Sequence, residues 1–272
     1  MLPYVIFSLA LLGFSAGAFR RRQTLRASLQ VIQGTAIASL GELQAVVDHV
    51  AGEIGKGAYQ ERVALLGKID CPTPLTAPLS QQPCVYYRTR VTERYKALQT
   101  RRDRDGNRRR QWRKGSTVLS SDELRSPFSL QDESGQVAVD PEGFTVEGVG
   151  VVERFEPVAD QGAADSFAPG IAPSRKRLTP RRDRTYRTLG YHYREEILPL
   201  GATVYIIGDL TDAGGLAVRS LATPAGLITH RSQQAVVAQK QGSIRQATWV
   251  SIGLGALSAT VLAYGLYQVL GN

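Results

Sequence analysis

The side chains that could carry catalysis or bind a metal ion are few and far apart in this sequence. The chain has three histidines, His49, His192 and His230, and two cysteines, Cys71 and Cys84. None of them lies at a spacing typical of a metal motif. Two cysteines make no disulfide framework, and free cysteines are most often small packing residues. The sequence therefore predicts no catalytic residue, no metal site and no cofactor.

The best candidates for acid–base chemistry share one predicted strand. His192 lies between Tyr191 and Tyr193, and the sequence shows no partner that would make it a base, so a structural role is favoured. Glu195 and Glu196 are adjacent carboxylates, but neighbouring strand residues point to opposite faces, so we predict that they do not act as a pair. The sequence contains no glycine-rich phosphate loop, dinucleotide fingerprint or nucleophile elbow.

Positive charge is concentrated in two short runs. The chain has 33 Lys and Arg against 24 Asp and Glu, a net charge of +9. Residues 101–114 hold eight basic and two acidic side chains, and residues 175–187 hold seven and one. Outside these runs, acidic residues slightly outnumber basic ones. The predicted contact residues for anionic lipid or an acidic partner are Arg101, Arg102, Arg104, Arg108, Arg109, Arg110, Trp112, Arg113, Lys114, Arg175, Lys176, Arg177, Arg181 and Arg182.

Three interpretations of the basic runs remain open from sequence. Anionic lipid head groups attract cations near a membrane surface by about 1 kcal/mol each. A solvated loop without any ligand is nearly as well supported, because blocks of like charge repel one another and stay in water. Nucleic acid is the least favoured of the three. The sequence does not identify the protein partner.

The first basic run is predicted to form the tip of a long hairpin. Residues 84–95 alternate β-branched or aromatic side chains with charged ones, which is typical of a strand with one exposed face. Asp105-Gly106-Asn107 has the chemistry of a turn, and residues 111–119 could return as the partner strand. The second basic run follows residues 160–174, a stretch rich in Gly, Ala, Pro and Ser that predicts a loop.

The rest of the chain reads as strands with a few helices. Ser39 and Glu42 have the spacing of a capping box and predict an amphipathic helix over residues 40–52. From about Gln233 the sequence becomes helical again. The remaining strand candidates, separated mostly by glycine-containing turns, are residues 62–69, 85–94, 127–130, 136–139, 151–155, 186–195, 202–210 and 216–221.

Both ends of the chain carry uncharged apolar stretches. About 20 such residues can cross a bilayer as a helix, and basic residues flank each stretch on the side facing the middle of the chain. The positive-inside rule then places the middle in the cytoplasm and both termini outside. A pair of buried core helices is one alternative, but core helices rarely lack charge over so many residues. A cleaved signal peptide is a further alternative for the first stretch, but its start lacks positive charge. We therefore predict a membrane-anchored α+β protein with transmembrane helices at 1–19 and 246–270 and a β-rich domain at 20–245.

Several motifs, taken in their order along the chain, carry a family resemblance. They are Cys84-Val-Tyr-Tyr-Arg88, then Phe128, Asp132, Gly135 and Val139-Asp140-Pro141, then Glu195-Glu-Ile-Leu-Pro-Leu-Gly-Ala202 followed by Tyr205-Ile-Ile-Gly208. This series, bracketed by two apolar stretches, resembles the GIDE domain, the module beside the membrane in GIDE or MULAN-type E3 ubiquitin ligases. The resemblance covers nearly the whole chain.

The resemblance implies a function and also marks a departure. In the family, a RING domain with eight Cys and His zinc ligands recruits the ubiquitin-charged E2, whereas this sequence has two Cys and three His. The implied function is therefore a membrane-proximal protein-binding or scaffolding module, and the alternative is E3-type ubiquitin transfer with a RING supplied in trans. Mitochondrial family members place the module in the intermembrane space, but the charge flanks of this sequence favour the cytoplasm.

Overall fold

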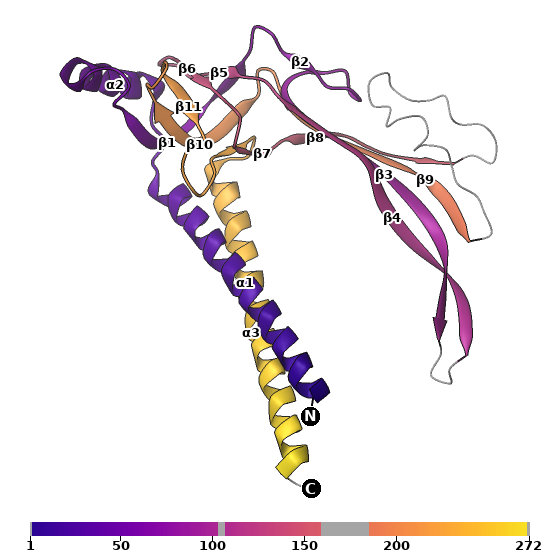
Figure 1. Ribbon diagram of the computed structural model, residues 1–272. Coiled ribbons are helices and arrows are strands. Elements are labelled where there is room, and N and C mark those ends of the chain that lie inside the picture. Colours follow the sequence, from indigo (N-terminus) through magenta and orange to yellow (C-terminus); the bar gives the residue numbers. More distant parts are fainter. Residues whose placement is uncertain (1, 103–106, 159–184, 271–272) are drawn as a thin grey trace.

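The computed structural model describes residues 2–102, 107–158 and 185–270. Figure 1 shows three parts: a β-rich body, a pair of long helices, and a long two-stranded ribbon that extends beyond the body. The helices are α1 (Leu2–Gly34), α2 (Leu40–Ile54) and α3 (Gln233–Leu270), of which α1 and α3 form the pair.

The body is built on a seven-stranded sheet with the order β1-β5-β6-β11-β10-β12-β7. β1 also pairs antiparallel with β10, from Gln60 opposite Thr211 to Lys68 opposite Thr203. Two strand pairs of this sheet are parallel, β11 with β6 and β12 with β7, and the remaining pairs are antiparallel. The strands are β1 (Gln60–Asp70), β5 (Phe128–Gln131), β6 (Gln136–Val139), β7 (Thr145–Glu147), β10 (Thr203–Thr211), β11 (Ala217–Arg219) and β12 (Leu227–Thr229).

The central strand β10 is buried on both sides, which explains its nearly continuous run of apolar residues. Ile206 belongs to the main core on one side of the sheet. Tyr205 and Ile207 point to the other side, where they pack with Ile32 of α1 and Val236 of α3. The bases of the two long helices are therefore attached to the body by apolar contacts with this strand.

Helix α2 begins where the capping residues predicted it. The Ser39 side chain accepts a hydrogen bond from the Glu42 N–H at 3.3 Å, and Leu40 and Val47 are buried in the main core. The Leu40 N–H also donates to Asp132 Oδ2 at 2.9 Å. Burial raises the pKa of Asp132, but this and its other hydrogen bonds outweigh burial and hold that pKa below its usual value. The predicted helix over 40–52 is confirmed and ends two residues later.

A second, five-stranded sheet carries the ribbon. Its strands are β2 (Leu75–Thr76), β3 (Pro83–Arg102), β4 (Arg108–Arg125), β8 (Val149–Pro157) and β9 (Tyr186–Pro199). β3 lies between β4 and β9, and β8 pairs with the other edge of β9. The predicted long hairpin is confirmed, because β3 and β4 pair from Tyr86 opposite Arg125 out to Arg102 opposite Arg108.

The helix pair corrects the predicted architecture. Within the described part of the chain, no helix is sufficiently long and apolar for a membrane crossing. The membrane-anchored fold with transmembrane helices at 1–19 and 246–270, and the two-span localisation derived from it, are therefore wrong.

The prediction treated each apolar stretch as an isolated segment. In the structure, α1 continues from its apolar part through Arg20 to Arg22, and α3 includes Lys240 and Arg245 before its apolar part. The two helices lie side by side (Figure 1). The Ser15 hydroxyl of α1 donates to the Ser251 carbonyl oxygen of α3 at 3.1 Å. One side of each helix is thus used for contact with the other.

Alkaline pH is expected to destabilise the fold. Burial, with a smaller contribution from the Glu195 carboxylate, raises the pKa of the Cys84 thiol to about 11, and burial raises the pKa of Tyr191 and of Tyr205 to about 12. The unfolded chain loses these protons at lower pH than the folded chain, so stability falls from about pH 8.5 upward.

Urea unfolding at about pH 7 and about pH 10 measures this loss. Cys84→Ala should reduce the difference between the two pH values. An unchanged difference would show that Cys84 does not contribute.

Candidate binding surface on the basic ribbon

The register of β3 and β4 gathers six cations on one face of the outer ribbon. Directly paired residues on neighbouring strands point to the same side of a sheet, as do residues two positions apart along a strand. Arg102 pairs with Arg108, and Lys96 pairs with Lys114. We name this side of the outer β3–β4 hairpin the cationic face. Its residues are Arg94, Lys96, Leu98, Thr100, Arg102, Arg108, Arg110, Trp112, Lys114 and Ser116.

The other side of the same ribbon carries fewer cations. Arg101 pairs with Arg109, and Ala97 pairs with Arg113. The strand period therefore divides the cations of the outer ribbon unequally between the two faces, with six on the cationic face and three on the other. The alternation of side chains along each strand indicates two faces already in the sequence. Which residues of the two strands share a face can be identified only when the pairing register is known.

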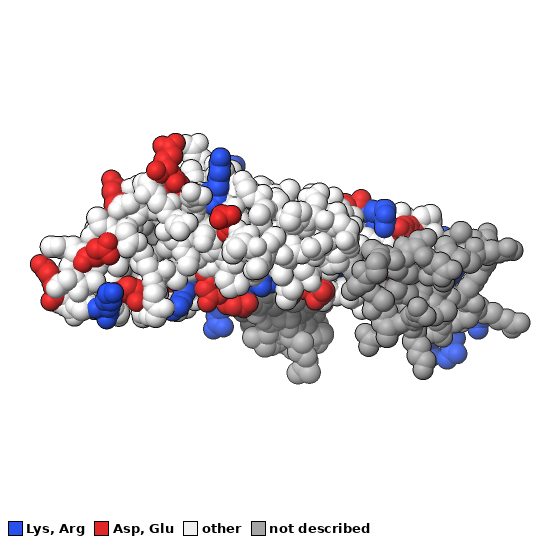
Figure 2. Space-filling view, turned by 90° about the horizontal axis from the view of Figure 1, so that it is seen from above, with Lys and Arg blue, Asp and Glu red and all other residues white. Residues whose placement is uncertain are grey.

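The outer ribbon is exposed to solvent. Every residue from Arg108 to Lys114 is exposed, and Trp112 keeps 46% of its surface accessible. Figure 1 shows the ribbon and the helix pair projecting from the same side of the body. By contrast, acidic and basic side chains are interspersed over the face of the body that Figure 2 shows.

The structure thus brings together eight of the fourteen predicted contact residues. They are Arg101, Arg102, Arg108, Arg109, Arg110, Trp112, Arg113 and Lys114. The other six, Arg104, Arg175, Lys176, Arg177, Arg181 and Arg182, lie outside the described residues.

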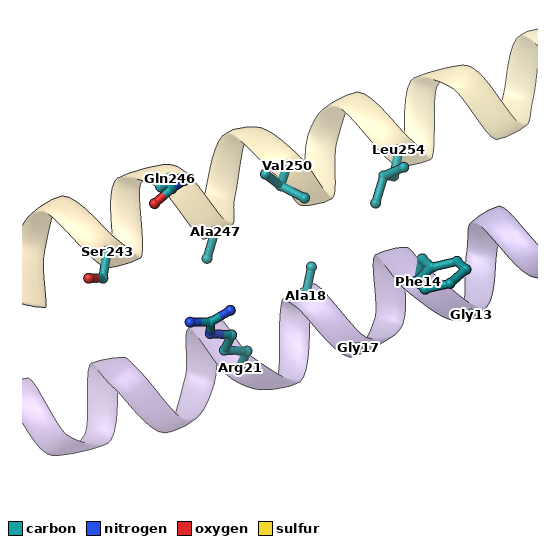
Figure 3. A pocket seen from close by; sticks show the side chains of 10 residues that line it. All are labelled: Gly13, Phe14, Gly17, Ala18, Arg21, Ser243, Gln246, Ala247, Val250 and Leu254. Carbon is teal, nitrogen blue, oxygen red and sulfur yellow. The ribbon is translucent and has the colours of Figure 1, made fainter. Parts of the chain in front are cut away.

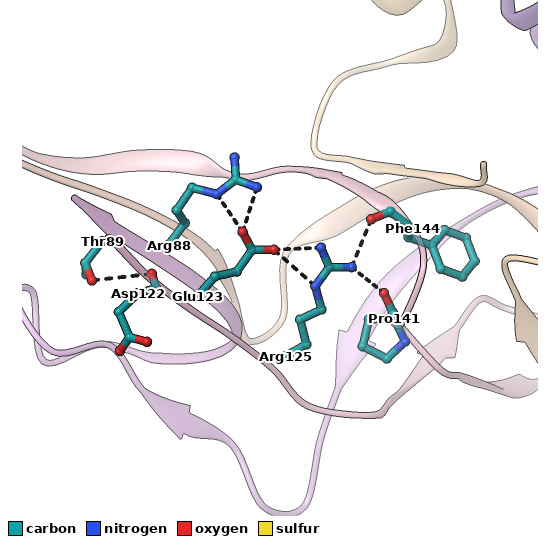
Figure 4. Close-up of polar contacts among 7 residues, drawn as sticks. All are labelled: Arg88, Thr89, Asp122, Glu123, Arg125, Pro141 and Phe144. Atoms are coloured by element: carbon teal, nitrogen blue, oxygen red, sulfur yellow. Dashed lines mark hydrogen bonds and ion pairs between the residues drawn. The ribbon is translucent and has the colours of Figure 1, made fainter. Parts of the chain in front are cut away.

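The cations at the base of the ribbon have a carboxylate partner. Figure 4 shows Glu123 between Arg88 and Arg125, with Nη2 of each arginine 2.8 and 2.6 Å from the carboxylate. Burial raises the pKa of Glu123, but the two arginines outweigh it and lower that pKa below the usual value. The guanidinium of Arg125 also donates to the carbonyl oxygens of Pro141 and Phe144, at 2.7 and 2.9 Å. These contacts tie the ribbon to the body.

A cavity of about 520 Å³ opens where the outer ribbon meets β8 and β9. Four strands contribute to its lining: Arg94 from β3, Lys114, Gly115 and Ser116 from β4, Phe155 from β8, and Leu189 and His192 from β9. His192 Nε2 lies 3.6 Å from Glu153 Oε1. Sequence reasoning missed this cavity because its lining residues are spread over about a hundred positions and meet only through the sheet register.

A larger cavity of about 770 Å³ lies between α1 and α3 (Figure 3). Gly13, Gly17, Ala18 and Ala247 have small or no side chains and leave this space open. Arg21 is the only charged side chain among the described residues that line it. Apart from Arg21, the described lining consists of small, apolar and uncharged polar side chains. These described residues include none of the His, Glu, Asp, Lys, Tyr or Cys side chains that act as general acids or bases.

The two adjacent glutamates point to opposite faces of β9, as predicted. Glu195 is completely buried and its carboxylate accepts hydrogen bonds from the Leu79 and Ser80 N–H groups, both at 2.8 Å. Glu196 lies 3.7 Å from Arg194 on the outer face. Glu195 is therefore a structural acceptor. Over the described ranges, no group of three or more His, Cys, Asp and Glu side chains could hold a metal ion.

Comparison with known protein families gives a match over parts of both sheets. A family model described as GIDE, E3 ubiquitin ligase, matches residues 98–263, which is more than half of the chain. The matched region begins in the outer part of β3 and runs into α3. No curated protein and no solved structure matches the chain.

Proposed function

Because the chain belongs to the GIDE family, we propose that it is a protein-binding module of a ubiquitin-ligase system. The cationic face of the ribbon is the surface that binds an acidic protein partner. The role of this chain in that system is to hold the partner, and the chemistry of ubiquitin transfer is supplied by another component.

The observation that carries this proposal is the concentration of exposed cations on a projecting two-stranded ribbon. The outer strands extend beyond the body (Figure 1), and the exposed cations of the cationic face are Arg94, Arg102, Arg108, Arg110 and Lys114. A surface of one sign attracts an oppositely charged partner and raises the rate of encounter. The nearby exposed indole of Trp112 adds the kind of aromatic anchor that interfaces favour.

Ubiquitin transfer with a RING supplied in trans is the second candidate function. The family description, E3 ubiquitin ligase, favours it. A RING needs eight Cys and His ligands, and residues 1–272 contain two Cys and three His. A RING partner recruited by this chain would therefore provide the zinc sites and the surface for the E2.

Neutralising the ribbon is expected to release the partner. The triple variant Arg102→Ser, Arg108→Ser and Arg110→Ser removes three exposed cations of the cationic face, and we expect it to weaken binding of an acidic protein by about tenfold or more at low salt. The measurement is in-cell crosslinking and affinity capture of the full-length chain, followed by binding of the purified partner at two salt concentrations.

The matched control is Lys56→Ser, Lys68→Ser and Arg231→Ser, which removes three exposed cations from the body. It should retain the partner. Equal retention by both triple variants would contradict the proposed binding surface. Capture of a RING protein that depends on the ribbon would favour the second candidate function, and recovery of anionic lipid alone would show that the cations contact lipid instead of protein.

A further inference from the structure

The cavity at the base of the outer ribbon has the chemistry of an oxyanion site. We propose that it binds a phosphate group carried by a phosphorylated side chain of the partner protein. This inference rests on the proposed function, because the cavity continues the cationic face toward the body: Arg94 and Lys114 belong to both.

The polar groups that line the cavity are all able to donate hydrogen bonds. Arg94 offers a guanidinium, Lys114 an ammonium, Ser116 a hydroxyl and His192 a ring nitrogen. No carboxylate is among the described residues that line the cavity. Neither Arg94 nor Lys114 has an ion-pair partner among the residues that the structure describes. The acid beside the cavity is Glu153, which contacts His192 at 3.6 Å. A ligand with several acceptor oxygens would complete this set.

The number of donors favours phosphate over carboxylate. A carboxylate carries one negative charge on two oxygens, whereas a phosphorylated side chain carries about −1.5 to −2 on three terminal oxygens. Arg94 and Lys114 together match the charge of phosphate, and the hydroxyl and imidazole can serve its remaining oxygens. Arginine-containing clusters of this kind are a common means of recognising phosphorylated protein segments.

The apolar lining gives room for the side chain that carries the phosphate. Phe155 and Leu189 provide the apolar surface. A Cβ built on Gly190 would lie 2.6 Å from the ring of Phe155, so the glycine allows that ring to lie across β9. Gly115 contributes only backbone to the cavity, and a Cβ added there would lie 2.6 Å from the Tyr95 ring. An aromatic phosphoester side chain fits this combination of an apolar wall and a cationic end.

The test compares short peptides of Glu and Gly that carry one central phosphotyrosine, tyrosine or additional glutamate. Fluorescence anisotropy with the full chain should show the phosphotyrosine peptide binding about tenfold or more tightly than the other two. Arg94→Gln and Lys114→Gln should each remove most of this difference. Arg194→Gln, an exposed cation of the same sheet outside the cavity lining, should preserve it. Thermal unfolding of each variant checks that the fold is retained.

The outcomes separate this inference from the proposed function. If the phosphotyrosine and tyrosine peptides bind equally, but both are released by the Arg102, Arg108 and Arg110 triple variant, the phosphate site is wrong and the acidic-partner surface stands. If the phosphate preference depends on Arg94 and Lys114 while the triple variant has no effect, the phosphate site stands alone. Inorganic phosphate that competes as well as the phosphopeptide would overturn recognition of a phosphorylated partner, and so would equal binding of the glutamate peptide.

Discussion

Replacing Glu195 with alanine is expected to lower the free energy of unfolding by about 3 kcal/mol. Its side chain is completely buried in β9. The carboxylate accepts the Leu79 and Ser80 N–H groups, both at 2.8 Å. Alanine would leave two backbone donors of a half-buried loop without their acceptor, and each buried donor left without an acceptor costs about 1–3 kcal/mol.

The loss would extend to the loop that these donors belong to. The loop is closed by hydrogen bonds from the Ala77 N–H to the Gln82 carbonyl oxygen at 2.9 Å and from the Gln81 N–H to the Ala77 carbonyl oxygen at 2.9 Å. Leu79 packs against the buried cluster of Val91 and two tyrosines of β9. Without Glu195, the loop would lose its attachment to the sheet, and this cluster would lose part of its cover.

The adjacent Glu196 provides the matched control. Glu196→Ala removes a half-buried carboxylate whose ion-pair contact is with Arg194 at 3.7 Å, so a cost of about 0.5 kcal/mol or less is expected. Glu195→Gln should lie between the two alanine variants, because an amide offers one acceptor oxygen in place of two. Urea unfolding curves give all three values. Similar costs for the two alanine variants would disprove the role assigned to Glu195.

Local patterns were sufficient to predict the elements that short-range physics determines. The alternation in residues 84–95 and the turn at Asp105-Gly106-Asn107 predicted the hairpin, because strand period and turn chemistry act over a few residues. The spacing of Ser39 and Glu42 predicted the start of α2, because the cap is a contact between neighbours in sequence.

Features that depend on distant partners were missed or predicted wrongly. Hydropathy summed along a stretch takes no account of the helix that will lie beside it, so α1 and α3 were assigned to a membrane. Glu195 gained its role from Leu79 and Ser80, more than a hundred positions earlier. The cavity lined by Arg94, Lys114 and His192 exists only because four strands meet in one register.

The motifs that carried the family resemblance are largely core residues. Cys84 and Tyr86 of the first motif, Glu195 of the last, and Tyr205 just after it are all at most 1% exposed. Such positions are restricted by packing and buried hydrogen bonds, so they identify the fold. The exposed cations of the ribbon are not among them, so the family resemblance and the proposed binding surface rest on different residues.

Replacing Arg125 with alanine is expected to destabilise the protein by about 2 to 3 kcal/mol and to loosen the ribbon at its base. Its mostly buried guanidinium joins Glu123 of the ribbon to the carbonyl oxygens of Pro141 and Phe144 in the body (Figure 4). Alanine would leave both carbonyl oxygens and one side of Glu123 without this donor. It would also remove the guanidinium from above the Tyr86 ring, 5.8 Å from its centroid.

Arg88→Ala is the comparison that isolates the link to the body. Arg88 resembles Arg125 in two contacts, because it also pairs with Glu123 and lies 5.9 Å from the Tyr86 ring centroid. Arg88 is more exposed than Arg125, and the donor to the two carbonyl oxygens of the body is Arg125. A cost of about 1 kcal/mol or less is therefore expected from unfolding curves.

Because the pKa of Glu123 is lowered in the folded state, the ionised carboxylate of Glu123 stabilises the fold above the unfolded pKa of about 4.3. This contribution to stability is lost as pH falls below that value. Arg125→Ala should reduce that acid sensitivity, and hydrogen exchange should rise at the base of β3 and β4. If Arg88→Ala costs as much as Arg125→Ala, the stabilisation comes from the ion pair itself and not from the contacts that join the ribbon to the body.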